Sequence, residues 1–419
     1  MRNRKMWYFI VLLAAAGLLQ TFGCGRNAEE RVEREVQERV QIRFYGEVID
    51  YPSGPLMTEA LVEKCKNQID VVPEVVDWGA LEEEIIQGIT SGQPSDIYQY
   101  PIHKMKLFCN MALDLTPYVQ DDPEFASRFR ENEWQKCMID GKILIVPWEY
   151  NFPVVLANRE ILSKAGVEIP DSWRYEDFCA ECEKIKALGI YPFANSIDRG
   201  HGSWLYRNAI LSTTLSAGTY EEYKNGNLSF EGEENREALE SIKTLYDKGY
   251  MFPGEGAATA GYDEIKAAFL NGELAMMTDA AAGAVAMAKE AEENGVRVCL
   301  VPWPAAGEAD AVHSGDNGLF IPKNCKNPDA AMEVIKEFTD QDIQSIHAEY
   351  GYIPANTFVE TGDEMIRVMM DQTRMIYAED PPNRDMETYR GRKLIPELIL
   401  GNGTEAVMEQ MEQIRLQAE

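Results

Sequence analysis

The chain has 419 residues, of which 45% are apolar, and its 70 acidic and 40 basic residues give a formal net charge of −30 at pH 7. This length is more than one compact core normally holds, so we expect two or more lobes. Nucleic acids and anionic membrane surfaces need clustered Lys and Arg, so the acidic composition argues against both as partners.

The first residues predict export. A basic start is followed by an apolar run of thirteen residues, 7–19, whereas a membrane span needs about 20. We therefore interpret residues 1–23 as a signal peptide. Gly23 precedes Cys24 as in a lipoprotein cleavage site, so we expect Cys24 to become a lipidated first residue; the alternative is cleavage nearby and a soluble product. The lipid would anchor the protein to the outer face of the cell membrane.

Strands and helices are predicted to alternate after a charged tether at 24–40. The segment "QIRFYGEVID" alternates apolar and polar residues as a strand does. A helix pattern, a second extended run, a helix and a third strand ending in "SDIYQY" follow it. This order is typical of a parallel sheet that helices cover.

The next strand region is interrupted. Two apolar runs, 143–146 and 153–157, enclose Trp148, Glu149, Tyr150 and Asn151. Inside one core strand these polar groups would need buried partners. We therefore expect the chain to cross an open cleft at this point.

Helices dominate the rest of the chain. Short strands are predicted at 274–278, in "VRVCLVPWPA" and in "DNGLFIPKN". A helix is expected to begin at Pro328, with Asn327 as its cap. From 341 to the end the pattern indicates only helices and loops.

Seven cysteines follow Cys24, and an odd number cannot form a complete set of internal disulfides. Cys179 and Cys182 form a CxxC within an amphipathic helix, so we interpret them as ordinary core or surface thiols. No second CxxC or spaced His pair supports zinc. We expect no metal and no cofactor.

Four segments in order carry a resemblance to a known family: "SDIYQY" with "LDLTPYV", "DGKILIVPWEYNFPVVLANREILSKAGVEIPDSW", "IKAAFLNGELAMMTDA" and "FIPKNCKNPDAAMEVIKEFTDQDIQSIHAEYGYIPAN". The chain resembles the extracellular solute-binding proteins of ABC importers, in particular the sugar-binding group that includes maltose-binding protein. The resemblance implies an α/β fold of two lobes, which are joined by crossing strands and close by a hinge around a ligand cleft.

The resemblance also implies where the lobes divide. Crossings are expected at 148–152 and 298–303, and the chain is expected to return to the helical lobe near 337–343. The predicted N-terminal lobe is then 41–150 with 299–338, and the C-terminal lobe is 151–298 with 339–419.

A sugar presents apolar faces and a rim of hydroxyls, so its site needs aromatic plates and fixed polar groups. Both kinds of side chain occur beside the predicted strand ends, where open α/β sheets place their ligands. The candidates are Tyr45, Glu47, Tyr100, His103 and Lys104 in the first lobe, Trp148, Glu149 and Asn151 at the crossing, His201, Trp204 and Asp279 in the second lobe, and, as secondary candidates, Trp303, Asp316 and Tyr389.

Some of these residues match ligand-binding positions of the family, and at other positions this chain differs from the family. Positions that match Tyr100, His103 and Lys104 carry an aromatic plate and two polar sugar contacts in the family, and His103 replaces an acid. Asp279 matches a helix start that faces the cleft, and its alternative role is an N-cap. The "AAAGA" that follows lacks the aromatic plate usual there, which weakens the analogy with maltodextrin binding.

The expected function is capture of a mono- or oligosaccharide by a monomer and delivery to the membrane permease, without catalysis. A carbohydrate-active enzyme is the alternative from another class, because 70 acids make a pair of catalytic carboxylates easy to find. If the protein is a binding protein, the alternative ligands are a peptide, a polyamine or a metal chelate.

Overall fold

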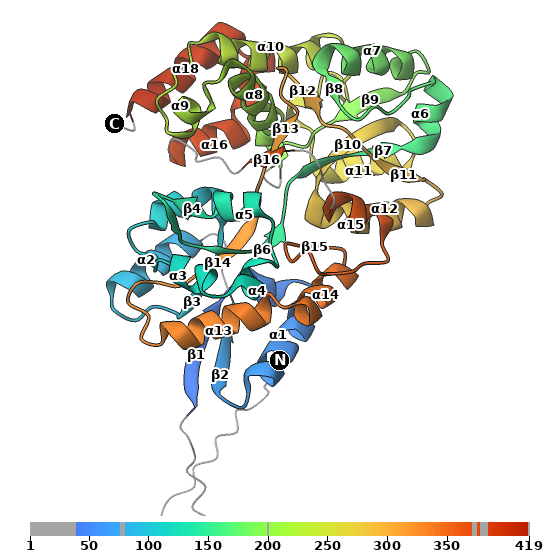
Figure 1. Cartoon of the computed structure of the whole chain (residues 1–419). Coiled ribbons are helices and arrows are strands. Elements are labelled where there is room, and N and C mark those ends of the chain that lie inside the picture. Colours follow the sequence, from blue (N-terminus) through green and yellow to red (C-terminus); the bar gives the residue numbers. More distant parts are fainter. Residues whose placement is uncertain (1–38, 76–79, 199–200, 371–374, 378–383, 418–419) are drawn as a thin grey trace, which may run out of the picture. The chain divides into compact units, whose positions relative to one another are not determined.

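The computed structural model describes residues 39–75, 80–198, 201–370, 375–377 and 384–417. The predicted signal peptide, Cys24 and the tether up to residue 38 lie outside the described residues. From Arg39 onward the chain forms one unit built on two main sheets (Figure 1). We call each sheet with its helices a lobe.

The first lobe begins as the alternation predicts. Strand β1 pairs in parallel with β2 and β3, and α1 and α2 connect them, so the predicted strand–helix order is confirmed. The sheet has the order β15-β6-β14-β3-β1-β2. Its strands are β1 (Val40–Tyr45), β2 (Ile69–Glu74), β3 (Ile97–Pro101), β6 (Val146–Tyr150), β14 (Asn317–Phe320) and β15 (Ile353–Pro354).

Helices and short elements complete this lobe. The helices are α1 (Gly54–Cys65), α2 (Leu81–Thr90), α3 (Thr116–Gln120), α4 (Pro123–Ala126), α5 (Glu131–Lys136), α13 (Pro328–Phe338), α14 (Gln341–Glu349) and α15 (Glu364–Met370). The 3-10 turns η1 (Glu47–Asp50) and η2 (Ile102–Phe108) follow β1 and β3, and β4 (Met138–Ile139) pairs with β5 (Lys142–Ile143).

The second sheet has the order β11-β7-β10-β9. All six residues of β7 are buried; Val154 and Leu156 join one apolar cluster, whereas Val155 and Ala157 join the other. Helices therefore cover both faces, as continuous apolar strands require. The strands are β7 (Pro153–Asn158), β9 (Tyr191–Ala194), β10 (Leu274–Ala280) and β11 (Val298–Val301).

The helices of the second lobe are α6 (Arg159–Ala165), α7 (Tyr175–Lys186), α8 (Trp204–Ala217), α9 (Tyr220–Lys224), α10 (Glu233–Asp247), α11 (Tyr262–Leu270), α12 (Ala281–Glu293), α16 (Arg384–Arg392), α17 (Leu394–Leu400) and α18 (Thr404–Gln417). Smaller elements are η3 (His201–Ser203), η4 (Ala257–Thr259), and the pairs β8 (Trp173–Arg174) with β12 (Pro304–Ala305) and β13 (Ala311–His313) with β16 (Met375–Tyr377).

The crossings differ in part from the predicted ones. The first lies at Asn151, between β6 of the first sheet and β7 of the second. The predicted second crossing at 298–303 instead contains β11, which pairs with β7, so the chain enters the first sheet only at β14. An apolar strand such as β11 suits either sheet, and the sequence pattern does not identify its partner.

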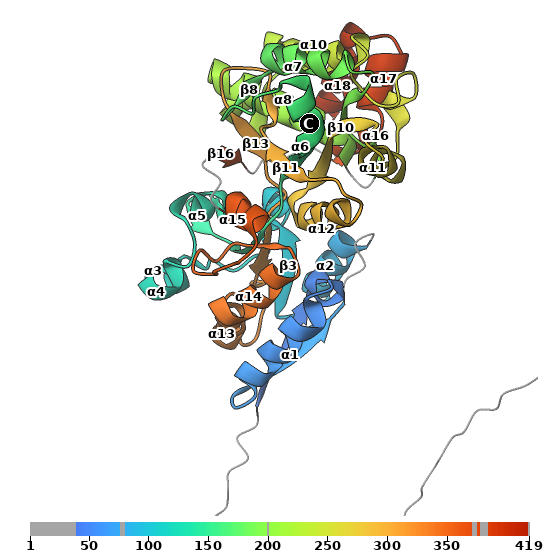
Figure 2. The same ribbon diagram turned by 90° about the vertical axis from the view of Figure 1, so that its right-hand side faces the viewer.

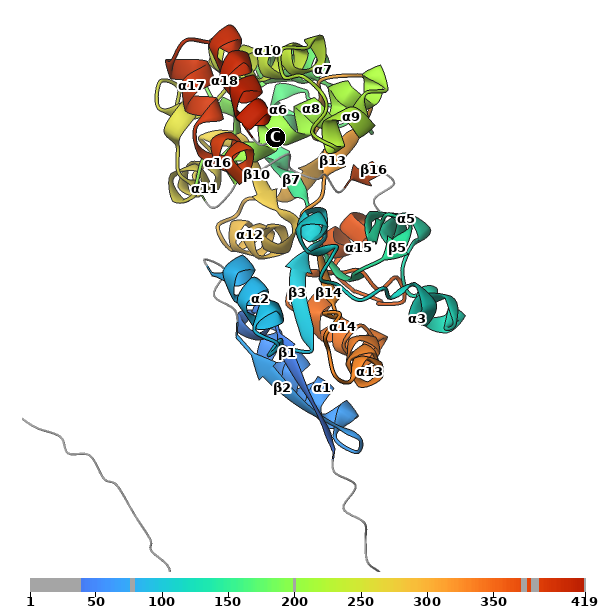
Figure 3. The same ribbon diagram turned by 90° about the vertical axis from the view of Figure 1, so that its left-hand side faces the viewer.

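The return to the second lobe also lies elsewhere than predicted. Helices α13 and α14 both pack against α1 of the first lobe (Figures 1 and 2), so the chain does not return near 337–343. Helices α16, α17 and α18 pack against one another, and α17 and α18 also against α10 (Figure 3). The return therefore lies between α15 and α16, and the lobe boundaries at 299 and 339 need correction.

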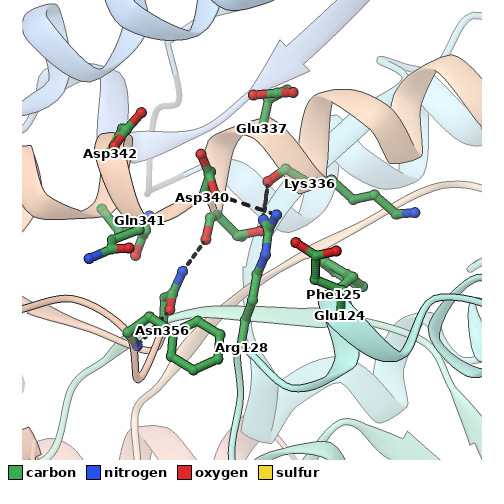
Figure 4. Close-up of polar contacts among 12 residues, drawn as sticks. Glu124, Phe125, Arg128, Lys336, Glu337, Asp340, Gln341, Asp342 and Asn356 are labelled. Carbon is green, nitrogen blue, oxygen red and sulfur yellow. Dashed lines mark hydrogen bonds and ion pairs between the residues drawn. The ribbon is translucent and has the colours of Figure 1, made fainter.

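Charged side chains hold the corner between α13 and α14 (Figure 4). Arg128 donates to the carbonyl oxygen of Lys336 at 2.6 Å and pairs with Asp340 at 3.4 Å. Lys64 of α1 pairs with the same carboxylate at 2.6 Å. The amide of Asn356 donates to the carbonyl of Thr339 at 2.8 Å. These contacts fix α13 and α14 on the first lobe.

Candidate functional site

One edge of the first sheet collects most of the predicted first-lobe residues. Strands β1 and β3 are parallel, and β14 is antiparallel to both β3 and β6, so β1, β3 and β6 all end at this edge. Tyr45, Tyr100 and Glu149 are each the last or second-last residue of one of these strands. Asp316 directly precedes β14.

The second sheet presents a corresponding edge. Strands β9 and β10 are parallel and end together, and the antiparallel β7 begins there. Asp279 lies at the end of β10, and the chain after β9 leads to His201 in η3 and to Trp204, the first residue of α8. Only Asn151 and Phe152 separate this edge from the first sheet along the chain.

A buried polar group joins the two crossing segments. The N–H of Asn151 donates to Asp316 Oδ1 at 2.9 Å, and the N–H of Gly315 donates to the carbonyl of Asn151 at 2.6 Å. The ammonium of Lys136 pairs with Asp316 Oδ2 and lies 2.7 Å from Glu133. We call Glu133, Lys136, Asn151 and Asp316 the hinge clasp.

The electrostatics of the hinge clasp follow from burial and from one cation between two acids. Burial raises the pKa of Glu133 to about 7, although the nearby charge of Lys136 opposes the shift. Burial alone would lower the pKa of Lys136, but the charges of Asp316 and Glu133 outweigh it and raise that pKa. Glu133 therefore titrates near neutral pH while Lys136 stays charged.

Three predicted residues of the second lobe come together. The rings of His201 and Trp204 stack with centroids 3.7 Å apart, and Tyr262 meets His201 edge-on at 5.7 Å. The hydroxyl of Tyr262 donates to Asp279 Oδ2 at 2.8 Å. Trp204 is half-buried and the other three are buried. We call His201, Trp204, Tyr262 and Asp279 the second-lobe cluster.

Neighbouring polar groups, of which Asn195 and Ser196 are buried and Asp198 is exposed, fix the position of the second-lobe cluster. Asn195 donates to the carbonyl of His201 at 3.3 Å, and Ser196 Oγ lies 3.1 Å from His201 Nδ1. Asp198 accepts from the N–H of Tyr262 at 2.9 Å. Tyr262 was not among the predicted site residues. Its position at the start of a helix, directly after Gly261, is the only sequence signal that could have suggested an aromatic ring at this edge.

Lys104 connects the two lobes. Its ammonium lies 2.9 Å from Glu387 of α16 and 3.9 Å from Glu82 of α2. Tyr100 donates its hydroxyl to Glu82 at 3.0 Å. Neither Glu82 nor Glu387 was predicted, because both lie in ordinary helix patterns.

Trp148 and Glu149 were predicted as ligand contacts, and the structure buries both completely. The indole of Trp148 packs against His347 at 4.9 Å and against Phe338 at 5.4 Å. Glu149 accepts from Asn317 Nδ2 at 2.8 Å, and His347 Nε2 lies 3.4 Å from its other oxygen. Internal partners occupy these two side chains, so we leave them out of the proposed site.

Four further predicted residues are also interior. The ring of Tyr100 packs edge-on against Phe108 at 4.8 Å, and Tyr389 donates to Glu397 at 2.7 Å. Trp303 is buried and lines a small apolar pocket beside Phe152. Asp316 belongs to the hinge clasp. The rings and the carboxylate therefore serve the fold.

The remaining predicted residues lie at the first-lobe edge. Tyr45 is 8% exposed and His103 is 7% exposed, while Asn151 is half-buried. The hydroxyl of Tyr45 has no hydrogen-bond partner among the described residues. The side chain of Glu47 lies outside the described part.

The described residues hold neither a metal-binding group of side chains nor a membrane-spanning helix. No group of three or more His, Cys, Asp or Glu side chains is arranged to hold a metal ion in this part of the chain. Within the same residues, every helix is too short or too polar to span a lipid bilayer.

Comparison with known proteins identifies the class. Residues 57–369 match the family described as bacterial extracellular solute-binding protein. This match covers more than half of the chain, so the chain belongs to that family, whose members bind solutes outside the cytoplasm and are not enzymes. It is also 24% identical over 295 residues to a binding protein of Brucella abortus, with 68% of each chain covered.

Solved structures show the same fold. A family 1 extracellular solute-binding protein from Bifidobacterium longum subsp. infantis matches with a TM-score of 0.75 at 14% identity, over 91% of this chain and 100% of that one. The sugar-binding protein MalE of Xanthomonas citri matches with 0.74 at 16%, over 90% and 97%. A chitin oligosaccharide binding protein matches with 0.69 at 22%, over 90% and 98%. The fold is the two-lobed one of solute-binding proteins of ABC transporters.

Proposed function

We propose that the protein captures a neutral mono- or oligosaccharide and delivers it to the permease of an ABC importer, anchored to the outer face of the membrane through lipidated Cys24. The second-lobe cluster carries this proposal. The half-buried ring of Trp204, stacked on His201, would offer a flat apolar face, and Asp279, which Tyr262 and the N–H of Ala280 hold in place, would accept a further hydrogen bond. A sugar ring needs this combination, because its C–H faces and its hydroxyls must both be matched.

The first lobe would supply the other half of the site. Tyr45, His103, Lys104 and Asn151 lie at the strand ends of its sheet, where open α/β sheets bind ligands. Two of the structural neighbours are named as binders of sugars, which supports the same ligand class. The fold itself allows other solutes, so peptides and polyamines belong in the test.

Thermal unfolding of the mature chain with a panel of neutral sugars, acidic sugars, peptides and polyamines tests the ligand class. A ligand that binds the folded state stabilises it by about 2.7 kcal/mol at 100 times its Kd, so a binding sugar raises Tm clearly. If only peptides or polyamines raise Tm, the proposal of a sugar is wrong.

Calorimetric titration with the sugar that gives the largest shift then tests the second-lobe cluster. An aromatic contact contributes about 0.5–1.5 kcal/mol beyond buried area, so Trp204→Ala should weaken binding several-fold or more. Tyr191→Ala is the matched control, because Tyr191 is an exposed aromatic at the opposite end of β9, and it should leave the affinity unchanged. Equal affinities for Trp204→Ala and the unaltered protein would remove Trp204 from the site.

A further inference from the structure

Two contacts connect the 3-10 turn η2 of the first lobe with helices of the second. Lys104 lies 2.9 Å from Glu387 of α16. Lys106 Nζ donates to Asn225 Oδ1, just after α9, at 3.3 Å. The two partners of each contact are far apart along the chain, and they belong to different lobes. Both contacts can exist only while the two lobes are close at η2.

The surroundings of Lys104 prepare it for such a contact. Its side chain is 26% exposed and that of Glu387 is 34% exposed, so water reaches the pair without fully screening it. Glu82, which Tyr100 holds through its hydroxyl, lies 3.9 Å from the same ammonium. Glu82 belongs to the first lobe and moves with Lys104. Glu387 is thus the only one of these two acids whose distance to Lys104 depends on the arrangement of the lobes.

We propose that Lys104 and Glu387 form a latch that holds the lobes together in the absence of solute. The crossing segments around Asn151 allow rotation, as hinges of a few residues do. Any contact made only when the lobes are together raises the population of that arrangement. A solute that needs the closed arrangement then binds more tightly, because less of its binding energy is used for closure.

The size of the effect follows from exposure. Ion pairs at this degree of exposure are weak, and the closed-to-open ratio should change by up to about fivefold when the pair is removed. Salt should weaken the latch, because the Debye length falls to about 3 Å at 1 M. The latch goes beyond solute capture and does not depend on the chemistry of the solute.

Single-molecule fluorescence energy transfer on the full chain without solute tests the latch. One dye is placed at Asp121 and one at Glu292, both exposed and in different lobes. Unnatural amino acids carry the dyes, because the part of the chain that the structure describes contains seven free cysteines, which would compete for thiol labels. Glu387→Gln should lower the closed-to-open ratio up to about fivefold and weaken its salt dependence.

Glu82→Gln is the matched control. This variant neutralises the other carboxylate beside Lys104, which belongs to the same lobe as the lysine. The closed population should therefore stay the same or rise. Circular dichroism confirms that both variants fold. If Glu387→Gln leaves the closed population and its salt dependence unchanged, or if Glu82→Gln lowers the population equally, the latch is disproved. Because no solute is present, this result is independent of the proposed sugar.

Discussion

At the residue scale, Asp279 depends on Tyr262. A carboxylate near a ligand must keep one orientation, and the 2.8 Å hydrogen bond from Tyr262 fixes one of its oxygens. The ring of Tyr262 also packs edge-on against His201. One side chain thus positions both the acceptor and the stacked pair of the second-lobe cluster.

Tyr262→Phe separates these two roles, because it keeps the ring and removes the hydroxyl. A hydrogen bond to a charged group contributes about 1.5–3 kcal/mol, so affinity for the proposed sugar ligand should fall roughly tenfold or more in calorimetric titration. Tyr206→Phe is the control, since Tyr206 donates to Asn235 elsewhere in the same lobe at 2.7 Å. That variant should lose stability and keep its affinity; an equal loss of affinity in both would point to a general effect of the lobe.

The burial of Trp148 predicts a role in stability. Its indole is fully buried and packs against Phe338 and His347. Trp148→Ala should lower the free energy of unfolding by about 3–5 kcal/mol, the usual cost of such a cavity, in urea unfolding. A loss below about 1 kcal/mol would show that the site collapses around the cavity or that the indole is less confined than its contacts indicate.

At the scale of elements, the hinge clasp ties α5 to both crossing segments. Lys136 of α5 contacts Asp316, and Asp316 accepts from the backbone of Asn151. The neighbours that set the charge of Glu133 are Lys136, Asp316 and Arg130. These charges lie in a buried environment, where electrostatic interactions are strong. Protonation of Glu133 therefore changes the interaction energy of the whole hinge clasp.

The clasp predicts a pH dependence of stability. The folded pKa of Glu133 is raised from an ordinary 4.5 to about 7, so the folded state binds this proton more tightly than the unfolded state. Its contribution is fully present below about pH 4.5 and is lost as pH rises through 7, by at most roughly 3 kcal/mol. The charges of Lys136 and Asp316 act on the same Glu133 proton, which makes this an upper bound.

Urea unfolding at pH 5 and pH 8.5 measures this contribution. Glu133→Gln, which stays neutral, should remove most of the fall between the two pH values and should be more stable than the unaltered protein at pH 8.5. Glu131→Gln, at an exposed position of the same helix, should leave the fall unchanged. The assignment is wrong if Glu133→Gln shows the same pH dependence as the unaltered chain.

At the scale of the whole molecule, two polar connections have different tasks. The hinge clasp is largely buried and lies where the chain passes between the sheets. The pair of Lys104 and Glu387 is partly exposed and joins residues of different lobes. The hinge clasp therefore joins the two crossing segments, and the proposed latch favours the arrangement with the lobes together.

Local patterns predicted many of the elements, but β15 and β16 lie after residue 341, where only helices and loops were expected. The strand–helix order of the first lobe, and a helix start at Pro328, are confirmed. The predicted cap Asn327 makes no side-chain capping bond, although the helix begins where expected. Periodicity and proline geometry act within a few residues, so these features need no information from the rest of the fold.

The sequence by itself determined the family resemblance, the order of elements and the gathering of polar residues at strand ends, because each depends on neighbours along the chain. Only the tertiary structure decided which of those residues are occupied internally. Glu149 meets Asn317 across 168 positions and Lys104 meets Glu387 in another lobe. Periodicity shows that a residue is buried but not what it packs against, so the crossings, the interior role of Trp148 and the part of Tyr262 in the second-lobe cluster emerged only when distant segments were brought together.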